Sequence, residues 1–132
     1  MNNLNKKVII LVIEDEKSLA DNLQERMKNV GFETISASDG SDGLKIALNR
    51  HPDLILLDLL MPNVDGMSML KDLRKDYWGK NVPVIILTNL SSSDEKINKD
   101  LTNLEPTYYF MKTEIGVDGI IEKIKERLGI IN

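Results

Sequence analysis

The chain has 132 residues, the length of one ordinary domain, which is enough to bury about two-thirds of the surface that the unfolded chain exposes. With 42% hydrophobic and 29% charged residues the composition is that of a globular protein, and a net charge of −4 lacks the basic excess that binding to nucleic-acid phosphates requires. The absence of cysteine excludes disulfides, thiolate metal sites and thiol chemistry.

These features predict a single domain over residues 1–132 that works in the cytoplasm and binds neither nucleic acid nor a membrane. No run approaches the roughly 20 apolar residues of a membrane span. The apolar run at Val8–Ile13 is too short for a secretion signal and is followed by Glu14-Asp15-Glu16. We interpret that run as a central strand covered on both faces.

An amphipathic helix follows this strand, and Gly31 supplies its C-terminal stop. Next, Phe32–Ala37 is short and more polar, which suits a strand at the edge of a sheet. The apolar stripe of the helix consists of Leu19, Leu23, Met27 and Val30.

The middle of the chain repeats the alternation. A turn at Asp39-Gly40 opens a second helix that ends by His51-Pro52, and the apolar run Leu54–Leu57 then predicts a buried strand that ends on Asp58. A third helix follows, for which Asp65 is available as the N-cap. The apolar residues of these two helices are Leu44, Ala47 and Leu48, and Met67, Leu70 and Leu73.

The last third contains two more strands, each followed or preceded by a helix. Pro83–Leu87 has the pattern of a buried strand, and Ser92 with Glu95 forms a capping box at the start of a fourth helix. Thr107–Met111 is an aromatic-rich strand, and Gly129 closes a fifth helix. The apolar stripes of these helices are Ile97, Leu101 and Leu104, and Val117, Ile120, Ile121, Ile124 and Leu128.

Five alternations of strand and helix predict a doubly wound α/β domain, with a parallel sheet and helices on both faces. In such sheets ligands bind beyond the carboxyl ends of the strands. The polar residues at those ends are Glu14-Asp15, Asp58, Thr88 and Lys112. We therefore expect them to converge on one edge.

This set of residues predicts phosphoryl chemistry. Carboxylates forced together repel one another unless a cation neutralises them, and oxygen ligands favour Mg²⁺. Lys112 adds a positive charge and Thr88 adds a hydroxyl group, which suits the oxygens of a phosphoryl group. Asp58 is the natural nucleophile and would form an aspartyl phosphate.

The chain resembles a response-regulator receiver domain of bacterial two-component signalling over essentially its whole length, Val8–Leu128. The resemblance rests on Glu14-Asp15, on the Asp-x-x-Met-Pro-x-x-Asp-Gly string from Asp58 to Gly66, on Thr88 and on Lys112. It implies a flavodoxin-like, five-stranded parallel sheet in the order 2-1-3-4-5. It also implies a domain that accepts a phosphoryl group from a histidine kinase or phosphotransfer protein, and that catalyses only this transfer and slow self-dephosphorylation.

The resemblance implies a role for each matching residue. Asp58 would be the phosphoacceptor, and Asp15, Asp58 and the carbonyl of Leu60 would bind Mg²⁺ directly. Glu14 would act on the metal largely through water. Thr88 and Lys112 would contact the phosphoryl group.

The resemblance also implies a switch and an output surface. When Asp58 is phosphorylated, Thr88 would move and Tyr109 would turn into the space that it leaves. The changed surface would comprise the fourth helix, the strand Thr107–Met111 and the helix Val117–Leu128, which would bind a downstream protein. We expect a monomer or a phosphorylation-dependent dimer. Because the sequence stops just after the last helix, we expect a stand-alone receiver.

Three positions are notable within this resemblance. The two that influence hydrolysis in the family are Leu60 and Leu90, whose side chains cannot hydrogen-bond a water, and this predicts a long-lived phosphoryl group. Thr113 stands where the family usually has proline after the lysine.

Other classes of protein are less compatible with the sequence. A haloacid-dehalogenase-type phosphatase normally has a second acid where this chain has Leu60, and a flavodoxin-like FMN carrier would be repelled by Glu14-Asp15-Glu16. A phosphorylation-independent interaction module remains an alternative that the intact acid set disfavours. We interpret Trp78 as cover for the third helix or fourth strand and His51 as a loop residue.

Overall fold

The computed structural model describes residues 7–59, 65–88, 103, 106–112 and 114–130. The predicted fourth helix, with its Ser92–Glu95 capping box, lies outside these residues. The described elements are, in chain order, β1 (Ile9–Ile13), α1 (Lys17–Asn29), β2 (Glu33–Ala37), α2 (Gly40–Arg50), β3 (Leu54–Asp58), α3 (Asp65–Lys75), β4 (Val84–Thr88), β5 (Tyr108–Met111) and α5 (Val117–Leu128).

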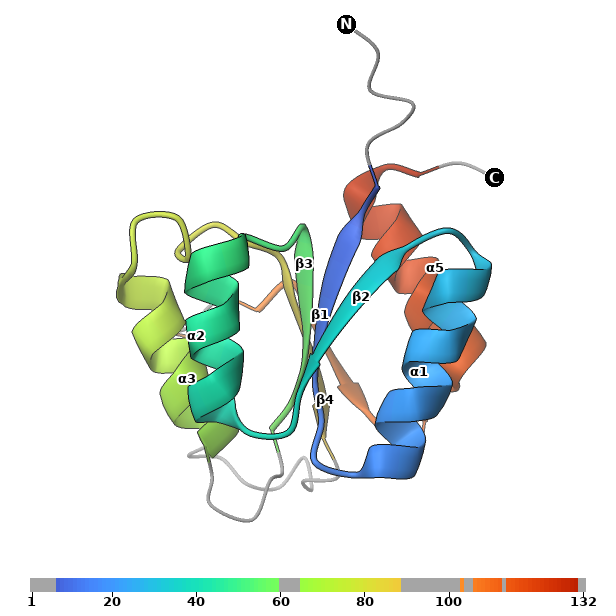
Figure 1. Cartoon of the computed structure of the whole chain (residues 1–132), viewed down its shortest axis with the longest axis horizontal. Helices are drawn as coiled ribbons and strands as arrows, with labels where there is room; N and C mark the ends of the chain where they lie inside the picture. Colours follow the sequence, from blue (N-terminus) through green and yellow to red (C-terminus); the bar gives the residue numbers. More distant parts are fainter. Residues whose placement is uncertain (1–6, 60–64, 89–102, 104–105, 113, 131–132) are drawn as a thin grey trace, which may run out of the picture.

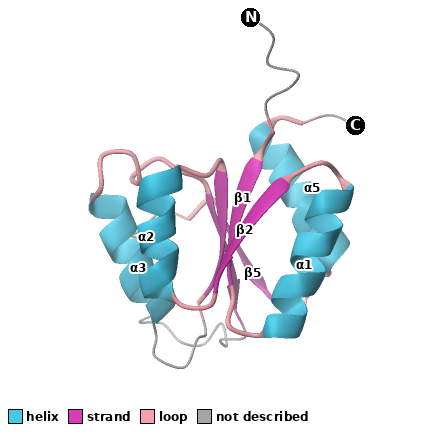
Figure 2. Ribbon diagram, viewed as in Figure 1, coloured by secondary structure: helices cyan, strands magenta, loops and turns pink. Residues whose placement is uncertain are grey.

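The strands form one parallel sheet in the order β2-β1-β3-β4-β5. Helices α2 and α3 cover one face of this sheet, and α1 and α5 cover the other (Figures 1 and 2). The predicted doubly wound fold and its strand order are therefore confirmed. The more polar strand, β2, is at the edge, as its composition predicted.

Alternate side chains of the central strands divide the core into two layers. In β1, Leu11 and Ile13 pack in the layer under α2 and α3, whereas Ile10 and Val12 pack in the layer under α1 and α5. Every residue of β3 and of β4 is buried. Strands covered on both faces need apolar residues at consecutive positions, which explains the unbroken apolar runs in the sequence.

Two residues of the predicted apolar stripes are exposed in the structure. Val30 is 41% exposed because it follows the last residue of α1 and leaves the helical conformation, so it does not belong to the buried stripe. Leu48 is 37% exposed because the buried side of α2 runs through Gly40, Gly43 and Ala47. No helix within the described ranges combines the length and the apolar character of a membrane span.

Candidate functional site

The sheet register brings the predicted polar residues to one edge. Beyond the last pair of β1 and β2, the backbone N–H of Glu14 donates to the carbonyl of Ala37 (3.0 Å). Beyond the last pair of β4 and β5, the N–H of Lys112 donates to the carbonyl of Thr88 (2.8 Å). Asp58 is the last residue of β3 and pairs with Leu87, the residue before Thr88. The carboxyl ends of four strands therefore meet here, as predicted.

Three carboxylates gather at this edge. Glu14, Asp15 and Asp58 each place one oxygen within 4.8 Å of the others. Glu14 and Asp58 are only 4% and 2% exposed, whereas Asp15 is exposed. The group thus has a buried part and an open side.

Lys112 places one positive charge against the two buried carboxylates of this group. Its Nζ lies 3.0 Å from Asp58 Oδ2 and 3.1 Å from Glu14 Oε1. Burial of Lys112 acts to lower its pKa, but hydrogen bonds to Asp58 and Glu14 outweigh this effect and raise the pKa above its ordinary value. The ammonium group therefore stays charged across the physiological range.

A single lysine does not compensate Glu14 fully. Burial, followed by a hydrogen bond with the Asp58 side chain, raises the pKa of Glu14 from 4.5 to about 7. Its Oε1 is buried and, although it is near Lys112 Nζ, it accepts no hydrogen bond from any residue that the structure describes. Such an atom is expected where a further cation binds, because a buried anionic oxygen that accepts no hydrogen bond is costly.

The donor set fits Mg²⁺. The three side chains offer only oxygen atoms, which are the ligands that hard divalent cations prefer. A divalent cation among them would compensate Glu14 and lower the pKa of that carboxyl group. The carbonyl of Leu60, also predicted as a ligand, lies outside the described residues.

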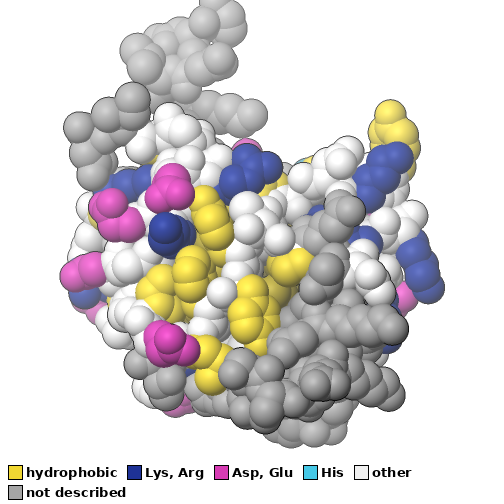
Figure 3. All heavy atoms as spheres, turned by 180° about the vertical axis from the view of Figure 1, so that it is seen from behind, with side chains coloured by type: hydrophobic (Ala, Val, Ile, Leu, Met, Phe, Trp, Pro, Cys, Tyr) yellow, Lys and Arg dark blue, Asp and Glu magenta, His cyan; other side chains and the backbone are white. Residues whose placement is uncertain are grey.

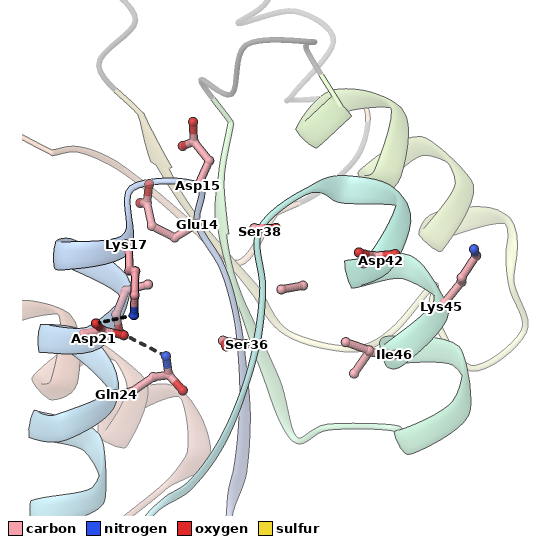
Figure 4. Close-up of a pocket in the computed structure, with 12 residues that line it drawn as sticks. Glu14, Asp15, Lys17, Asp21, Gln24, Ser36, Ser38, Asp42, Lys45 and Ile46 are labelled. Atoms are coloured by element: carbon pink, nitrogen blue, oxygen red, sulfur yellow. Dashed lines mark hydrogen bonds and ion pairs between the residues drawn. The ribbon is translucent and has the colours of Figure 1, made fainter.

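A pocket of about 560 Å³ opens next to these acids. Figure 4 shows Glu14 and Asp15 at its upper end, with Lys17, Asp21 and Gln24 of α1 on one side and α2 on the other. Glu14 and Asp15, but not Asp58, line this pocket, which opens to the solvent beside the edge strand β2.

The remaining predicted residues lie as follows. Thr88 is fully buried at the end of β4, and Tyr109 of β5 packs at the margin of the core layer under α2 and α3. Leu90, the other position predicted to control hydrolysis, and Thr113 lie outside the described residues, as Leu60 does.

The structure gives a physical role to Gly66, which the sequence analysis noted only as part of a motif. A Cβ atom on Gly66 would lie 2.9 Å from the carbonyl oxygen of Asp58, so only glycine allows α3 to begin this close to the acid. The Asp-Gly pair at Asp65-Gly66 was the available signal, because glycine is the usual residue where the backbone must approach another group closely.

The raised pKa of Glu14 predicts a pH dependence of stability in metal-free buffer. Between about pH 4.5 and pH 7 the folded protein holds a proton on Glu14 that the unfolded chain has lost. The free energy of unfolding therefore falls as the pH rises through this window. Compared with Glu14→Gln, the wild type should lose about 2 kcal/mol from pH 5 to pH 8.

Urea denaturation of both proteins with a chelator present, at several pH values, measures this difference. Saturating Mg²⁺ at pH 8 should stabilise the wild type more than the variant. A gap between the two proteins that stays constant with pH would show that Glu14 does not titrate in this range.

Comparison with known proteins agrees with this geometry. Residues 10–125 match the family described as "Response regulator receiver domain". A protein of Porphyridium aerugineum named "Probable transcriptional regulator ycf27" is 42% identical over 92 residues, which are 70% of this chain and 37% of that protein. The chain spans 37–38% of the length of the curated relatives that it matches first.

Two solved structures extend the comparison. The receiver domain of the Francisella response regulator 1452 is 32% identical, with a TM-score of 0.78 over 91% of this chain and 95% of that one. The receiver domain of a sensor histidine kinase from Pseudomonas aeruginosa PAO1, described with a magnesium ion coordinated in its active site cleft, is 21% identical. It gives a TM-score of 0.81 over 93% of this chain and 98% of that one.

Together, the doubly wound sheet and the acid cluster with its lysine define a class of signalling domains built around one strand-end aspartate. The chain belongs to the response regulator receiver domain family.

Proposed function

We propose that this domain is a phosphorylation-activated switch that takes a phosphoryl group onto Asp58 from a histidine kinase or phosphotransfer protein, in the cytoplasm. The observation that carries the proposal is the placement of Asp58, buried at the end of β3, within 3.0 Å of Lys112 and among two further carboxylates. A buried ion pair adds little net stability compared with apolar packing, so this arrangement favours a chemical role for Asp58.

The transfer needs little from the protein beyond position and charge. A carboxylate oxygen of Asp58 attacks the phosphorus of the donor phosphohistidine, an O–P bond forms, and the P–N bond breaks as the imidazole leaves. Lys112, which contacts Asp58 Oδ2 in the free protein, would turn its hydrogen bond to an oxygen of the transferred group. The Thr88 hydroxyl would contact another.

Glu14, Asp15 and Asp58 would hold Mg²⁺, with the carbonyl of Leu60. When bound, the ion supplies positive charge to the oxygens of the transferring group. The protein catalyses only its own phosphorylation and slow dephosphorylation, so we do not class it as an enzyme acting on a separate substrate.

The output surface would include β5 and α5. All four β5 residues are partly exposed, and Tyr108 Oη donates to Glu126 of α5 (3.0 Å), which ties the two elements together. Figure 3 shows hydrophobic side chains gathered across the back of the molecule. A downstream protein, or a second phosphorylated copy, would bind on this side.

Thr88→Ala should uncouple phosphorylation from partner binding. In the wild type, the Thr88 hydroxyl would move toward the phosphoryl oxygens and leave space for Tyr109. Alanine has no hydroxyl group to make this move, so Tyr109 should keep its position. The variant should still accept phosphate, while the phosphorylation-dependent shifts of amide resonances in β5 and α5 disappear. Equal shifts in variant and wild type would contradict this coupling.

The phosphoryl group should persist for longer than in receivers with polar residues at the positions of Leu60 and Leu90. Attack on the acyl phosphate requires an oriented water, and neither leucine can orient one. The double substitution Leu60→Asn with Leu90→Glu should accelerate decay of the phosphoprotein at unchanged Mg²⁺ affinity. A decay curve for labelled wild type as fast as that of the double variant would exclude control by these leucines.

One experiment separates the candidate functions. The protein is incubated with Mg²⁺ and a small phosphodonor such as phosphoramidate, and both protein-bound and released phosphate are followed. A receiver retains one labile acyl phosphate, a phosphatase turns the donor over repeatedly, and a phosphorylation-independent module does neither. We expect the first result.

A further inference from the structure

The sheet has an open edge at β2. This strand is the outermost on its side, and no second strand within the described ranges pairs with its outer side. Figure 1 shows β2 in front of the other strands, with α1 on one side of it and α2 on the other. The pocket that opens next to the acids lies at this edge, where Ser36, Ala37 and Ser38 line it. Another polypeptide can therefore reach the strand between the two helices.

The backbone of β2 has hydrogen-bonding groups that point outward. On the inner side, the Glu33 N–H donates to the Val8 carbonyl (2.8 Å), and the Ala37 carbonyl accepts from the residue that follows β1 (3.0 Å). Successive residues of a strand direct these groups to opposite sides, so residues 34 and 36 direct theirs away from β1. In the part of the chain that the structure describes, the backbone N–H and C=O groups of Thr34 and Ser36 take part in no hydrogen bond.

This edge lacks three features that commonly protect an exposed strand from pairing with another chain. Those features are a proline, a bulge and a lysine within the strand. β2 contains none of them, and it pairs with β1 without interruption from Glu33 to Ala37. Its only charged side chain, Glu33, is engaged by Arg50 at 3.6 Å. The unpaired backbone groups of β2 are therefore complementary to another extended strand.

The side chains of β2 make the strand complementary to a second copy of itself. Thr34 Oγ1 donates to Gln24 Oε1 of α1 (3.2 Å), and Ser36 lies on the same face of the strand. Ile35 packs on the other face, at the margin of the core layer under α2 and α3, and is only half-buried. In an antiparallel pair of β2 strands centred on Ile35, the two isoleucines would face each other, and Thr34 would face Ser36 of the second copy. Contacts between β-branched side chains and between hydroxyl side chains stabilise such pairs.

The charges at this edge do not oppose self-association. The sides of α1 and α2 that line the pocket carry two lysines and two aspartates, namely Lys17, Lys45, Asp21 and Asp42. Lys17 and Asp21 pair with each other at 2.9 Å. The acids Glu14 and Asp15 lie at one end of the pocket, beyond the last residue of β2. Because both signs flank the strand equally, the helices do not select an acidic or a basic partner over a second copy.

We propose that β2 is a homodimerisation edge, at which two copies of the chain join their sheets through antiparallel β2 strands related by a two-fold axis at Ile35. Each copy offers two N–H and two C=O groups, at Thr34 and Ser36, so the pairing forms four hydrogen bonds between the copies. β2 and β5 are at opposite edges of the sheet. The contact therefore leaves the proposed output surface free and requires no phosphoryl group.

Sedimentation equilibrium of the unphosphorylated protein measures self-association, from about 10 µM to about 1 mM protein in about 0.15 M salt. We expect a monomer–dimer equilibrium. Ser36→Lys should weaken it by about tenfold or more, because a lysine of each copy would lie at the shared edge. Ser68→Lys makes the same change at an exposed position of α3 and should leave the equilibrium unchanged. Both positions are exposed, and circular dichroism checks that the variants remain folded.

Hydrogen exchange of individual amides locates the contact. In the monomer, the outward N–H groups of Thr34 and Ser36 should exchange rapidly, whereas the N–H of Ile35 points toward β1 and should be protected. Raising the protein concentration into the range of the dimer should protect Thr34 and Ser36 in the wild type. The amides of β5 should not change, and Ser36→Lys should show no added protection at Thr34.

The proposal is overturned if the wild type remains monomeric at the highest concentration, or if Ser36→Lys dimerises like the wild type. It is also overturned if the amides of Thr34 and Ser36 exchange equally fast at low and high concentration, because a dimer would then form through another surface. No phosphodonor is present in these experiments, so a dimer that depends on phosphorylation does not contribute to the result.

Discussion

Replacing Lys112 by methionine should lower both the stability of the metal-free protein and the rate of phosphorylation. The substitution leaves the buried carboxylates of Glu14 and Asp58 without their shared cation, and removing one partner of a buried ion pair costs about 3–5 kcal/mol. It also removes a donor from the oxygens of the transferring phosphoryl group, and loss of such a donor slows comparable reactions roughly 10²–10³-fold.

The stability loss should depend on pH. It should be smaller at pH 5.5 than at pH 8, because protonation of Glu14, whose pKa burial raises to about 7, relieves the repulsion with Asp58. Lys17→Met is the matched control. Lys17 pairs with Asp21 at 2.9 Å on the surface of α1, and exposed pairs of this kind contribute about 0–1 kcal/mol.

Urea denaturation in chelator and the rate of phosphate incorporation measure the two effects. If Lys112→Met behaves like Lys17→Met in both measurements, the lysine has no role in the site. Loss of stability with an unchanged phosphorylation rate would restrict Lys112 to a structural role.

Asp15→Ala should weaken Mg²⁺ binding by roughly 10–100-fold or more. Loss of a residue that only supports a metal ligand already costs about this much, and Asp15 is proposed to bind the ion itself. Asp15 is the exposed member of the acid cluster, so its removal opens no cavity in the core and leaves the Lys112 contacts with Glu14 and Asp58 in place. Phosphorylation at limiting Mg²⁺ should fall in proportion, and higher Mg²⁺ should restore part of it.

Asp21→Ala is the control for this substitution. Asp21 lines the same pocket but belongs to the surface pair with Lys17 and not to the acid cluster. Isothermal titration with Mg²⁺ compares the two variants with the wild type. Equal affinity in Asp15→Ala and wild type would mean that the ion binds elsewhere.

The fold could be predicted because buried parallel strands leave an unambiguous mark in a sequence. The runs at Leu54–Leu57 and Val84–Leu87 are apolar without alternation, and both are central strands buried on both faces. The location of the site could be predicted for the same reason, because the carboxyl ends of parallel strands all lie at one edge of the sheet.

The detailed pairing at the site could not be predicted. That Lys112 contacts both Glu14 and Asp58 depends on how β5 aligns with β4, and nothing local to Lys112 encodes this register. The stack of His51 on Trp78 likewise joins two connections that are 27 positions apart in the sequence, and each residue alone resembled an ordinary loop or covering side chain.

The central claim, that Asp58 accepts the phosphoryl group, is tested most directly by locating the modified residue. The protein is phosphorylated by phosphoramidate with Mg²⁺, the acyl phosphate is reduced with borohydride, and peptides are sequenced by mass spectrometry. We predict homoserine at position 58 in the wild type, and none in Asp58→Asn or in wild type without the donor. Homoserine at another aspartate, or a labile phosphate that persists in Asp58→Asn, would contradict the account.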